Sequence, residues 1–276
     1  MLLALVTVAR FRPIAAVKRE RYCYHMADNH TFNKLVEEAL EQAFSGWDFS
    51  WVKDRLTESE TSWSYRNLVE DRLSHAEAVV DLCTGGGEFL ANLGKLPKIT
   101  YATEGYDPNV AVARKRLEPM GVQVVRFESD DELPLPSNVF DLVINRHGAY
   151  SPKELLRIST TGACFLTQQV GSDNASGLNQ ALNAPPPEHR TWCLDEAVEQ
   201  LTSLGLQIKK AEEERPTIHF SDVGAVVFYL KAIPWQVVNF DVSHYHDELL
   251  DIHHIIESTG SFDVNAHRFL VEATVP

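Results

Sequence analysis

Three consecutive glycines, Gly85, Gly86 and Gly87, directly follow an apolar run that ends in an acid, in the stretch VVDLCTGGGEFL of residues 79–90. The run AEAVVDLC predicts a buried strand, and the residues from Glu88 onward predict the start of a helix. Glycines at this turn let the backbone approach a ligand closely, and the helix start offers unpaired N–H groups. The stretch predicts an α/β fold with a ligand-binding loop; the alternative is a tight turn that binds nothing.

The alternation of strand and helix continues along the chain. Expected strands are KITYATE, VQVVRFES, VFDLVINRH and ACFLTQQV, with DPNVAVARKRLEPMG and SPKELLRIS as helices between them. Further on, LDEAVEQLTSLG and HYHDELLDIHHIIEST predict helices, LQIKKAEEE and HRFLVEATV predict strands, and VGAVVFYLKAI fits either. This order predicts a parallel, doubly wound sheet with right-handed crossovers.

Two further helices are expected before the first strand, one from Asp28 onward and one from Ser64 to Leu73. We therefore divide the chain into a helical cap of residues 26–75 and a main domain of residues 76–276, whose C-terminal elements face the substrate. Residues 1–25 are expected to be a disordered upstream extension or a misassigned start, with a weak targeting peptide as the alternative. Aromatic side chains before the first strand either pack in the cap core or close over a ligand; they are Trp47, Phe49, Trp51, Trp63 and Tyr65.

The formal net charge of −14 argues against DNA as a partner, because affinity for a phosphate backbone rests on clustered Lys and Arg. No stretch approaches the roughly 18 apolar residues of a membrane span. The four cysteines, Cys23, Cys83, Cys164 and Cys193, form no CxxC pair, which favours reduced thiols and a cytoplasmic location. The acidic balance favours a small partner that is neutral or cationic.

The second expected strand ends in an acid, Glu104, about two dozen residues beyond the glycine loop. An acid at this position of a nucleotide-binding sheet accepts hydrogen bonds from ribose hydroxyls. Asp81, just before the turn, either accepts from a ligand's ammonium group or braces the loop. A dinucleotide dehydrogenase is the competing interpretation of such a loop. That class of enzyme needs a third, helix-facing glycine, and the chain has Leu90 at that position, which argues against it.

Four stretches together resemble the class I S-adenosylmethionine-dependent methyltransferases: VVDLCTGGGEFL, ITYATEGYDPNVAVARKRL, ELPLPSNVFDLVINRH and CFLTQQVG. The likeness is to the small-molecule type, akin to the quinone-biosynthesis and trans-aconitate enzymes. GWDFSW and DVGAVVFYLKAIPW are similar to a narrower bacterial group. The resemblance implies a Rossmann-like, seven-stranded, mostly parallel sheet with helices on both faces, S-adenosyl-L-methionine as cofactor, and a small-molecule acceptor.

The resemblance also implies a set of cofactor-binding residues; they are Asp81, Thr84, Gly85, Gly86, Gly87, Glu104, Asp130, Asp131 and Asn145. The residues from Asp81 to Gly87 would form the methionine-binding loop, and Glu104 would bind the ribose. Either Asp130 or Asp131 would bind the adenine amino group, with solvated loop carboxylates as the alternative. The chain departs from the family pattern at Cys83, where a glycine is common, and at Ser129, where an acid is usual.

Asn145, Arg146 and His147 stand at the end of the fourth strand of the alternating series. The resemblance implies that they face the transferring methyl group, which makes Arg146 and His147 the candidate catalytic residues. Methyl transfer from a sulfonium needs alignment and desolvation, and a base only where the nucleophile must lose a proton. His147 is the candidate base; the alternative is a histidine that caps the strand end. Gln168 and Gln169 either orient a polar substrate or satisfy backbone groups.

The histidines His244, His246, His253 and His254 are not expected to hold a metal, because no cysteine or carboxylate set accompanies them. The chain is predicted to be a monomer or a homodimer. Two alternative functions stay open: an RNA-modifying methyltransferase, which a clustered basic face would favour, and a regulatory protein that binds the cofactor without turnover.

Overall fold

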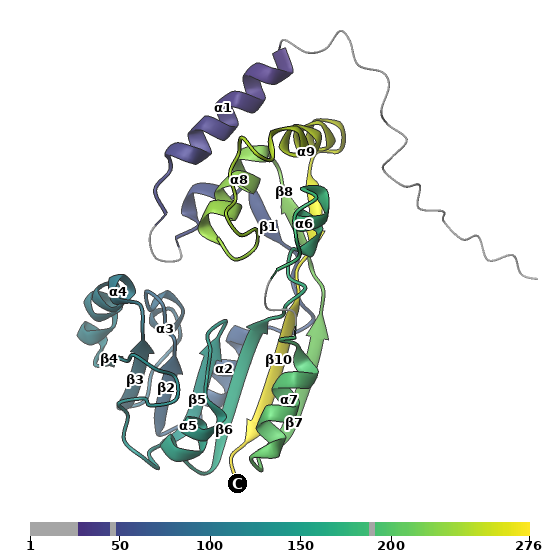
Figure 1. Cartoon of the computed structure of the whole chain (residues 1–276). Helices are drawn as coiled ribbons and strands as arrows, with labels where there is room; N and C mark the ends of the chain where they lie inside the picture. The colour runs from purple at the N-terminus through teal and green to yellow at the C-terminus, as the bar shows by residue number, and fades with distance from the viewer. Residues whose placement is uncertain (1–26, 45–47, 188–190) are drawn as a thin grey trace, which may run out of the picture.

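A computed structural model of the chain describes residues 27–44, 48–187 and 191–276 (Figure 1). Its larger sheet has seven strands in the order β4-β3-β2-β5-β6-β10-β7. The strands are β2 (Ala78–Leu82), β3 (Ile99–Glu104), β4 (Gln123–Arg126), β5 (Phe140–Arg146), β6 (Ser159–Val170), β7 (Gln207–Glu214) and β10 (Arg268–Thr274). The first five run parallel, and β10 is antiparallel to both β6 and β7. The expectation of a seven-stranded, mostly parallel sheet is confirmed.

Helices cover both faces of this sheet. The buried side chains of α2 (Tyr65–Leu73), α3 (Glu88–Ala91) and α4 (Asp107–Leu117) share one core with one face, and those of α5 (Pro152–Ile158) and α7 (Leu194–Ser203) share another core with the opposite face. A short 3₁₀ turn (Glu118–Met120) follows α4. Parallel strands are buried on both faces, which explains why these segments read as continuous apolar runs.

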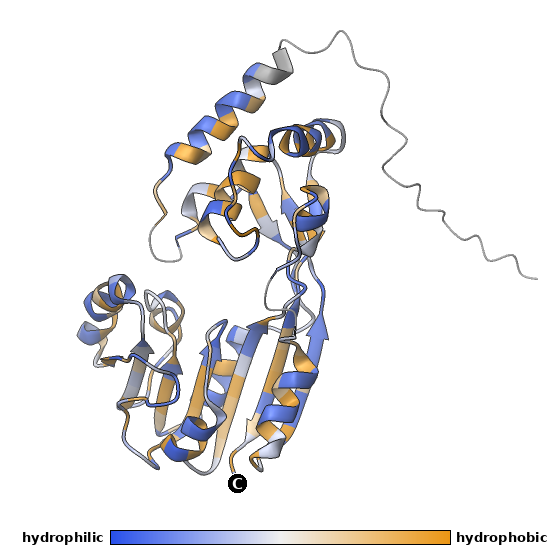
Figure 2. Cartoon of the chain, in the orientation of Figure 1, coloured by the Kyte–Doolittle hydropathy of each residue, from blue (hydrophilic) through white to orange (hydrophobic). Residues whose placement is uncertain are grey.

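The two cores follow from the alternation of side chains along each strand. On β2, Val79 joins the core under α2, α3 and α4, while Val80 and Leu82 join the core under α5 and α7. The edge strand β7 alternates exposed and half-buried residues, and Figure 2 shows it as largely hydrophilic beside the apolar inner strands. A charged edge strand protects a sheet against pairing with another chain.

A second, smaller layer forms a cap beyond the carboxyl ends of the parallel strands (Figure 1). It holds a three-stranded antiparallel sheet of β1 (Leu56–Glu58), β8 (Thr217–Phe220) and β9 (Phe262–Asn265). Its helices are α1 (Ala27–Glu41), α6 (Ser176–Ala181), α8 (Val223–Ala232) and α9 (His246–Thr259), with a 3₁₀ turn at Ser50–Val52. The chain passes between cap and main sheet five times, so the cap is assembled from three separate stretches of sequence.

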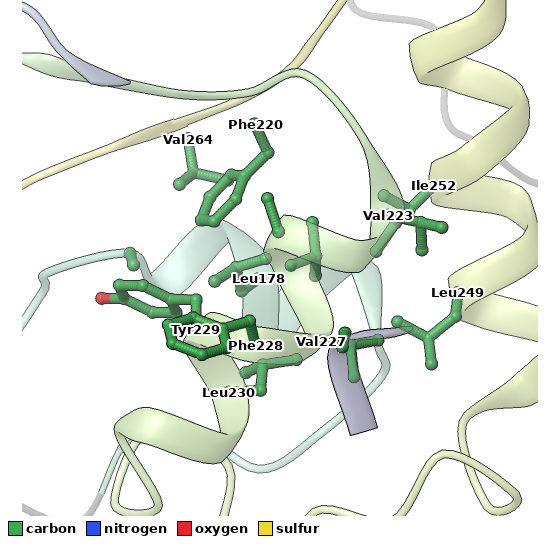
Figure 3. Packing of buried hydrophobic residues seen from close by; sticks show 14 of the residues in the cluster. Leu178, Phe220, Val223, Val227, Phe228, Tyr229, Leu230, Leu249, Ile252 and Val264 are labelled. Carbon is green, nitrogen blue, oxygen red and sulfur yellow. The ribbon is translucent and has the colours of Figure 1, made fainter. Parts of the chain in front are cut away.

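The apolar helix α8 is the centre of the cap core. Nine of its ten residues are buried, and Figure 3 shows Val227, Phe228 and Leu230 packed among side chains of α9, β8 and β9. Helix α1 lies close to it, since a Cβ added at Gly224 would stand 2.7 Å from the Leu35 carbonyl oxygen. The Lys231 ammonium then donates to the carbonyls of Ala39, Leu40 and Gln42 at the end of α1. A cation at this position satisfies carbonyls that have no partner within the helix.

The structure differs from the sequence-based division of the chain in two respects. Helix α2, expected in the cap, packs against the main sheet, and the cap takes much of its core from residues beyond 170. The ambiguous stretch VGAVVFYLKAI is helical, and the strands β1, β8 and β9 and helix α6 were not expected. Residues 1–25 and Trp47 lie outside the described residues. None of the described helices is long and apolar enough to cross a membrane.

We expect Phe228→Ala to destabilise the fold by about 3–5 kcal/mol, because the ring is 1% exposed and its removal leaves a cavity in the cap core. Urea unfolding measures the change. Val238→Ala is the control, since Val238 is 51% exposed and its truncation costs less than about 0.5 kcal/mol. Equal losses in the two variants would contradict this view of the cap core.

Candidate functional site

The glycine loop follows β2 and has the conformation that its sequence requires. Gly85 has φ 63° and Gly87 φ 78°, in the left-handed region that glycine adopts without penalty. A Cβ at Gly87 would lie 2.7 Å from Leu117 Cδ1, so the loop also packs tightly on α4. The Arg116 guanidinium donates to the carbonyl of Gly86 and pairs with Glu88. Arg116 of α4 therefore holds the loop and the start of α3 together.

Cys83 occupies the position where the family pattern has its first glycine, and the structure shows what that departure entails. Its φ is 58°, so a residue with a Cβ adopts the left-handed conformation. The backbone N–H of Cys83 donates to Thr103 Oγ1, and that of Thr84 donates to the Thr103 carbonyl. These bonds from β3 hold the turn in place, and the strained conformation costs about 1–2 kcal/mol relative to glycine.

Glu104, at the end of β3, ties the glycine loop to the neighbouring strand. Its Oε2 accepts from the backbone N–H of Gly85 at 2.7 Å, and its Oε1 accepts from that of Tyr106 at 2.7 Å. The residue is 7% exposed. A carboxylate has about four lone-pair sites, so each oxygen keeps a site for a further donor. The expected ribose-binding acid therefore lies beside the loop, oriented by two backbone bonds.

Asp81 is a buried carboxyl without a cationic partner. Thr84 Oγ1 donates to it at 2.7 Å, and within the described ranges no cationic group lies within 4 Å. Burial, with a smaller contribution from the charge of Glu104, raises the pKa of Asp81 to about 7, although the Thr84 bond and the charge of Arg146 act to lower it. A buried acid in this state gains most from a ligand that brings a positive charge.

Of the two candidate adenine-binding acids, Asp130 is the one whose charge acts on Cys83 of the loop. Asp130 is half-buried, and burial together with the charge of Asp131 raises its pKa. Burial and then the charges of Asp130, Glu104 and Asp81 raise the pKa of the Cys83 thiol to about 12, so these three acids all act on the loop. Asp131 is exposed.

Asn145 is fully buried and acts as a brace between strands. Its Nδ2 donates to the Leu82 carbonyl at 3.1 Å, and its Oδ1 accepts from Thr167 Oγ1 at 3.0 Å and from Gln169 Nε2 at 2.6 Å. The amide therefore links β2, β5 and β6 at their carboxyl ends. Arg146 and His147, the next two residues, are exposed on the cap side of the same edge.

A cleft of about 410 Å³ opens at this edge, where the chain crosses between sheet and cap. It is lined by Glu58, Thr61, Trp63, Tyr65, Arg66, Phe89, Arg146, His147, Gln168 and Arg268. A second hollow of about 590 Å³ adjoins it along β1 and the segment that follows. Sequence analysis named Arg146, His147, Gln168 and two of the aromatics here. It missed Glu58 and Arg268, because no local pattern shows that the short strand β1 meets the start of β10.

Arg268 is the most deeply buried charge of this cleft, at 8% exposed. Its guanidinium donates to Glu58 of β1, to Asn174 Oδ1 at 2.6 Å and to the carbonyl of His267. The group therefore connects the cap sheet to the first residue of β10. A buried ion pair with further hydrogen bonds fixes a geometry more than it adds stability.

The orientation of His147 follows from its neighbours. The Trp63 indole N–H, which is donor only, donates to Gln168 Oε1 at 2.8 Å, so Gln168 Nε2 is the donor toward His147 Nε2 at 3.1 Å. The proton of the neutral imidazole is then on Nδ1. Protein atoms around the ring displace water that would stabilise the charged form, and this lowers the pKa of His147. The positive charges of Arg146 and Arg268 lower it further, so the imidazole is neutral at physiological pH. To act as a base through Nε2, the ring must first release Gln168.

Gln169 and Trp51, for which the sequence left two roles open, both make contacts within the protein. Gln169 donates to Asn145 Oδ1, Thr167 Oγ1 and the Gly148 carbonyl, so it satisfies groups within the sheet. Trp51 packs in the cap against Phe228, with ring centroids 5.0 Å apart. No group of three or more His, Cys, Asp or Glu side chains within the described ranges is arranged to hold a metal ion.

Residues 80–157, which carry the glycine loop, Glu104 and the β5 end, match the family described as "Methyltransferase domain". This part of the chain is therefore a methyltransferase domain. The strand order with an antiparallel β10 agrees with this assignment, and the cofactor of the family is S-adenosylmethionine. The residues present fit that cofactor, because Asp81 is a buried acid that the Thr84 hydroxyl alone contacts among the described hydrogen bonds and Glu104 is an acid oriented by two backbone N–H groups.

Solved structures share the fold of this methyltransferase at low sequence identity. A candidate methyltransferase from Bacillus halodurans is 17% identical and superposes with a TM-score of 0.54 over 75% of this chain and 98% of its own. The YcgJ protein from Bacillus subtilis is 14% identical, with a TM-score of 0.56 over 76% and 97%. The [4+2]-cyclase SpnF is 16% identical, with a TM-score of 0.50 over 89% and 94%. None of the curated proteins matches the sequence.

We expect Cys83→Gly to be more stable than Cys83→Ala by about 1 kcal/mol, because both variants lose the thiol and only alanine keeps a Cβ at φ 58°. Thermal unfolding of the pair measures the difference. If the alanine variant proves equally stable, the left-handed conformation at this position is not a source of strain.

We expect Asp81→Asn to stabilise the free protein and to abolish cofactor binding. The pKa of Asp81 is raised from its ordinary 3.8 to about 7, so the native state holds a proton that the unfolded state has released, and stability falls as the pH rises between these values. Asparagine removes this dependence. The expected gain is about 2 kcal/mol at pH 8 and close to zero at pH 4.

Unfolding of wild type and Asp81→Asn in urea at both pH values measures this gain, and titration of S-adenosylhomocysteine at pH 8 measures the loss of binding. A gain of equal size at pH 4 would assign the effect to packing instead of to the carboxyl charge.

Proposed function

We propose that this methyltransferase transfers a methyl group from S-adenosylmethionine to a small-molecule acceptor bound in the cleft between the main sheet and the cap. The single observation that carries the proposal is that the glycine loop and the cleft adjoin. Phe89 of α3, directly after the loop, lines the cleft, and Arg146 of the cleft acts electrostatically on Asp81 of the loop.

Each part of the site has a distinct task in this proposal. When bound, the cofactor supplies an electrophilic methyl group on a sulfonium. Asp81 receives the cofactor's ammonium group, and Glu104 receives the ribose hydroxyls. The cleft orients the acceptor, and its cap side excludes water, so alignment and desolvation provide much of the rate. His147 takes a proton only where the acceptor must lose one, and Gln168 holds its ring in a fixed tautomer until then.

The acceptor's size class is proposed from the cleft and from the charge of the whole chain. A volume of about 410 Å³ suits a small molecule. Several arginines outside the cleft pair with nearby acids, such as Arg126 with Asp107 and Glu128, instead of forming a clustered basic face for RNA. Free thiols at Cys83 and Cys164 support a cytoplasmic location.

We expect Gly85→Arg and Glu104→Ala each to weaken binding of S-adenosylmethionine and S-adenosylhomocysteine by at least about tenfold. The first puts a side chain into a backbone at φ 63°, and the second removes the acceptor of the Gly85 N–H. Calorimetric titration measures both, and the wild type is expected to bind in the micromolar range.

The matched control is Glu128→Gln, because Glu128 is an acid shortly after the next strand, with a side chain 82% exposed, and its ion pair within the described residues is with Arg126. It should bind the cofactor as the wild type does. A folded wild type that binds neither cofactor form would refute the proposed function. Binding without methyl transfer to any acceptor pool would favour a regulatory role.

A further inference from the structure

The cleft is locally cationic, although the chain carries a formal net charge of −14. Three arginines line it, Arg66, Arg146 and Arg268, against one carboxylate, Glu58. A cleft of one sign concentrates ligands of the opposite sign, whatever the charge of the surface around it. The local balance therefore points away from the neutral or cationic acceptor that the composition favours.

Two of the three arginines are already engaged by protein groups. Arg268 pairs with Glu58. Arg66 pairs with Glu70 at 3.0 Å and donates to the carbonyl of Asn92 at 2.6 Å. These bonds hold both guanidiniums in place and leave them little need of a ligand.

Arg146 differs from both. Its guanidinium carbon lies 5.1 Å from the centre of the Phe89 ring, and within the described ranges no carboxylate lies within 4 Å of it. A guanidinium over an aromatic ring keeps its edge N–H donors for a planar anion. Asp81 is the acid whose field reaches it, and the proposed function assigns that acid to the cofactor's ammonium group. The charges of Arg146 and Arg268 both act on His147, so the two fields overlap in one part of the cleft.

We propose that the methyl acceptor carries a carboxylate group, which the Arg146 guanidinium binds inside the cleft. This proposal rests on the proposed function, because it names the substrate class of the same site. The neutral His147 and the Gln168 amide then lie beside the bound anion and repel it less than a carboxylate would. A forked guanidinium–carboxylate contact is stronger than a contact between neutral groups and fixes the acceptor's orientation.

The competing occupant of Arg146 is the carboxylate of the cofactor's own methionine part. That group and an acceptor carboxylate share the same chemistry, and the two sources predict different effects of removing Arg146. Loss of cofactor affinity would identify the first source, and loss of acceptor affinity would identify the second.

The test uses the full chain saturated with S-adenosylhomocysteine and matched pairs of probes: acetate and acetamide, benzoate and benzamide, indole-3-acetate and indole-3-acetamide. Competition calorimetry or ligand-observed NMR gives the affinity of each. We expect at least one acid to bind at least tenfold more tightly than its amide, and Arg146→Gln to abolish that preference while changing the affinity for S-adenosylhomocysteine less than twofold.

Arg114→Gln is the control, because it removes a positive charge from an exposed pair with Glu118 and leaves the cleft intact. It should keep the preference for the acid. If no acid binds better than its amide, or if Arg146→Gln weakens S-adenosylhomocysteine tenfold and leaves the acids unaffected, the carboxylate proposal is overturned. Failure of the wild type to bind S-adenosylhomocysteine would instead overturn the proposed function.

Discussion

The hydrogen bonds that Glu104 accepts from Gly85 and Tyr106 connect the parts on which the site depends. They join the loop after β2 to the turn after β3, at the carboxyl edge where neighbouring parallel strands end together. Without them, the left-handed residues of the loop would be free to relax, because glycines alone permit that conformation and do not impose it. The same two hydrogen bonds therefore order the loop backbone and hold the Glu104 carboxylate in a fixed orientation toward a ligand.

The same edge explains why the cleft lies where it does. Asn145 links β2, β5 and β6 from within the sheet, and the next residue, Arg146, turns out toward the cap. The chain crosses to the cap near this place, so Glu58 and Arg268 come from segments more than 200 residues apart and still meet. A rigid cofactor side and a separately assembled cap side are a physical basis for varying the acceptor while the cofactor half stays constant.

How much could be predicted from the sequence depends on how local the signal was. The strand carrying Val79 and Val80, the glycine turn and Glu104 were recognised because strand periodicity and turn chemistry act over a few residues. The strands β1, β8 and β9 were missed because each is three or four residues long and forms only by pairing with the others. The sequence pattern of α2 predicts a helix. It does not show whether Tyr65 and Val69 pack against the cap or against the main sheet.

The charge of the acceptor is another property that the sequence alone could not predict, because it depends on the electrostatic potential inside the cleft. A net charge of −14 describes the field far from the protein, where salt screens it within about 10 Å. Inside the cleft, the distances between Arg146, Glu58 and Arg268 decide the potential, and these depend on the pairing of β1 with β8 and on the start of β10. Total composition therefore favoured a cationic or neutral acceptor, while the arrangement of three guanidiniums around one carboxylate favours an anion. The two views differ because charge selects a ligand at the distance of contact, and only the fold sets that distance.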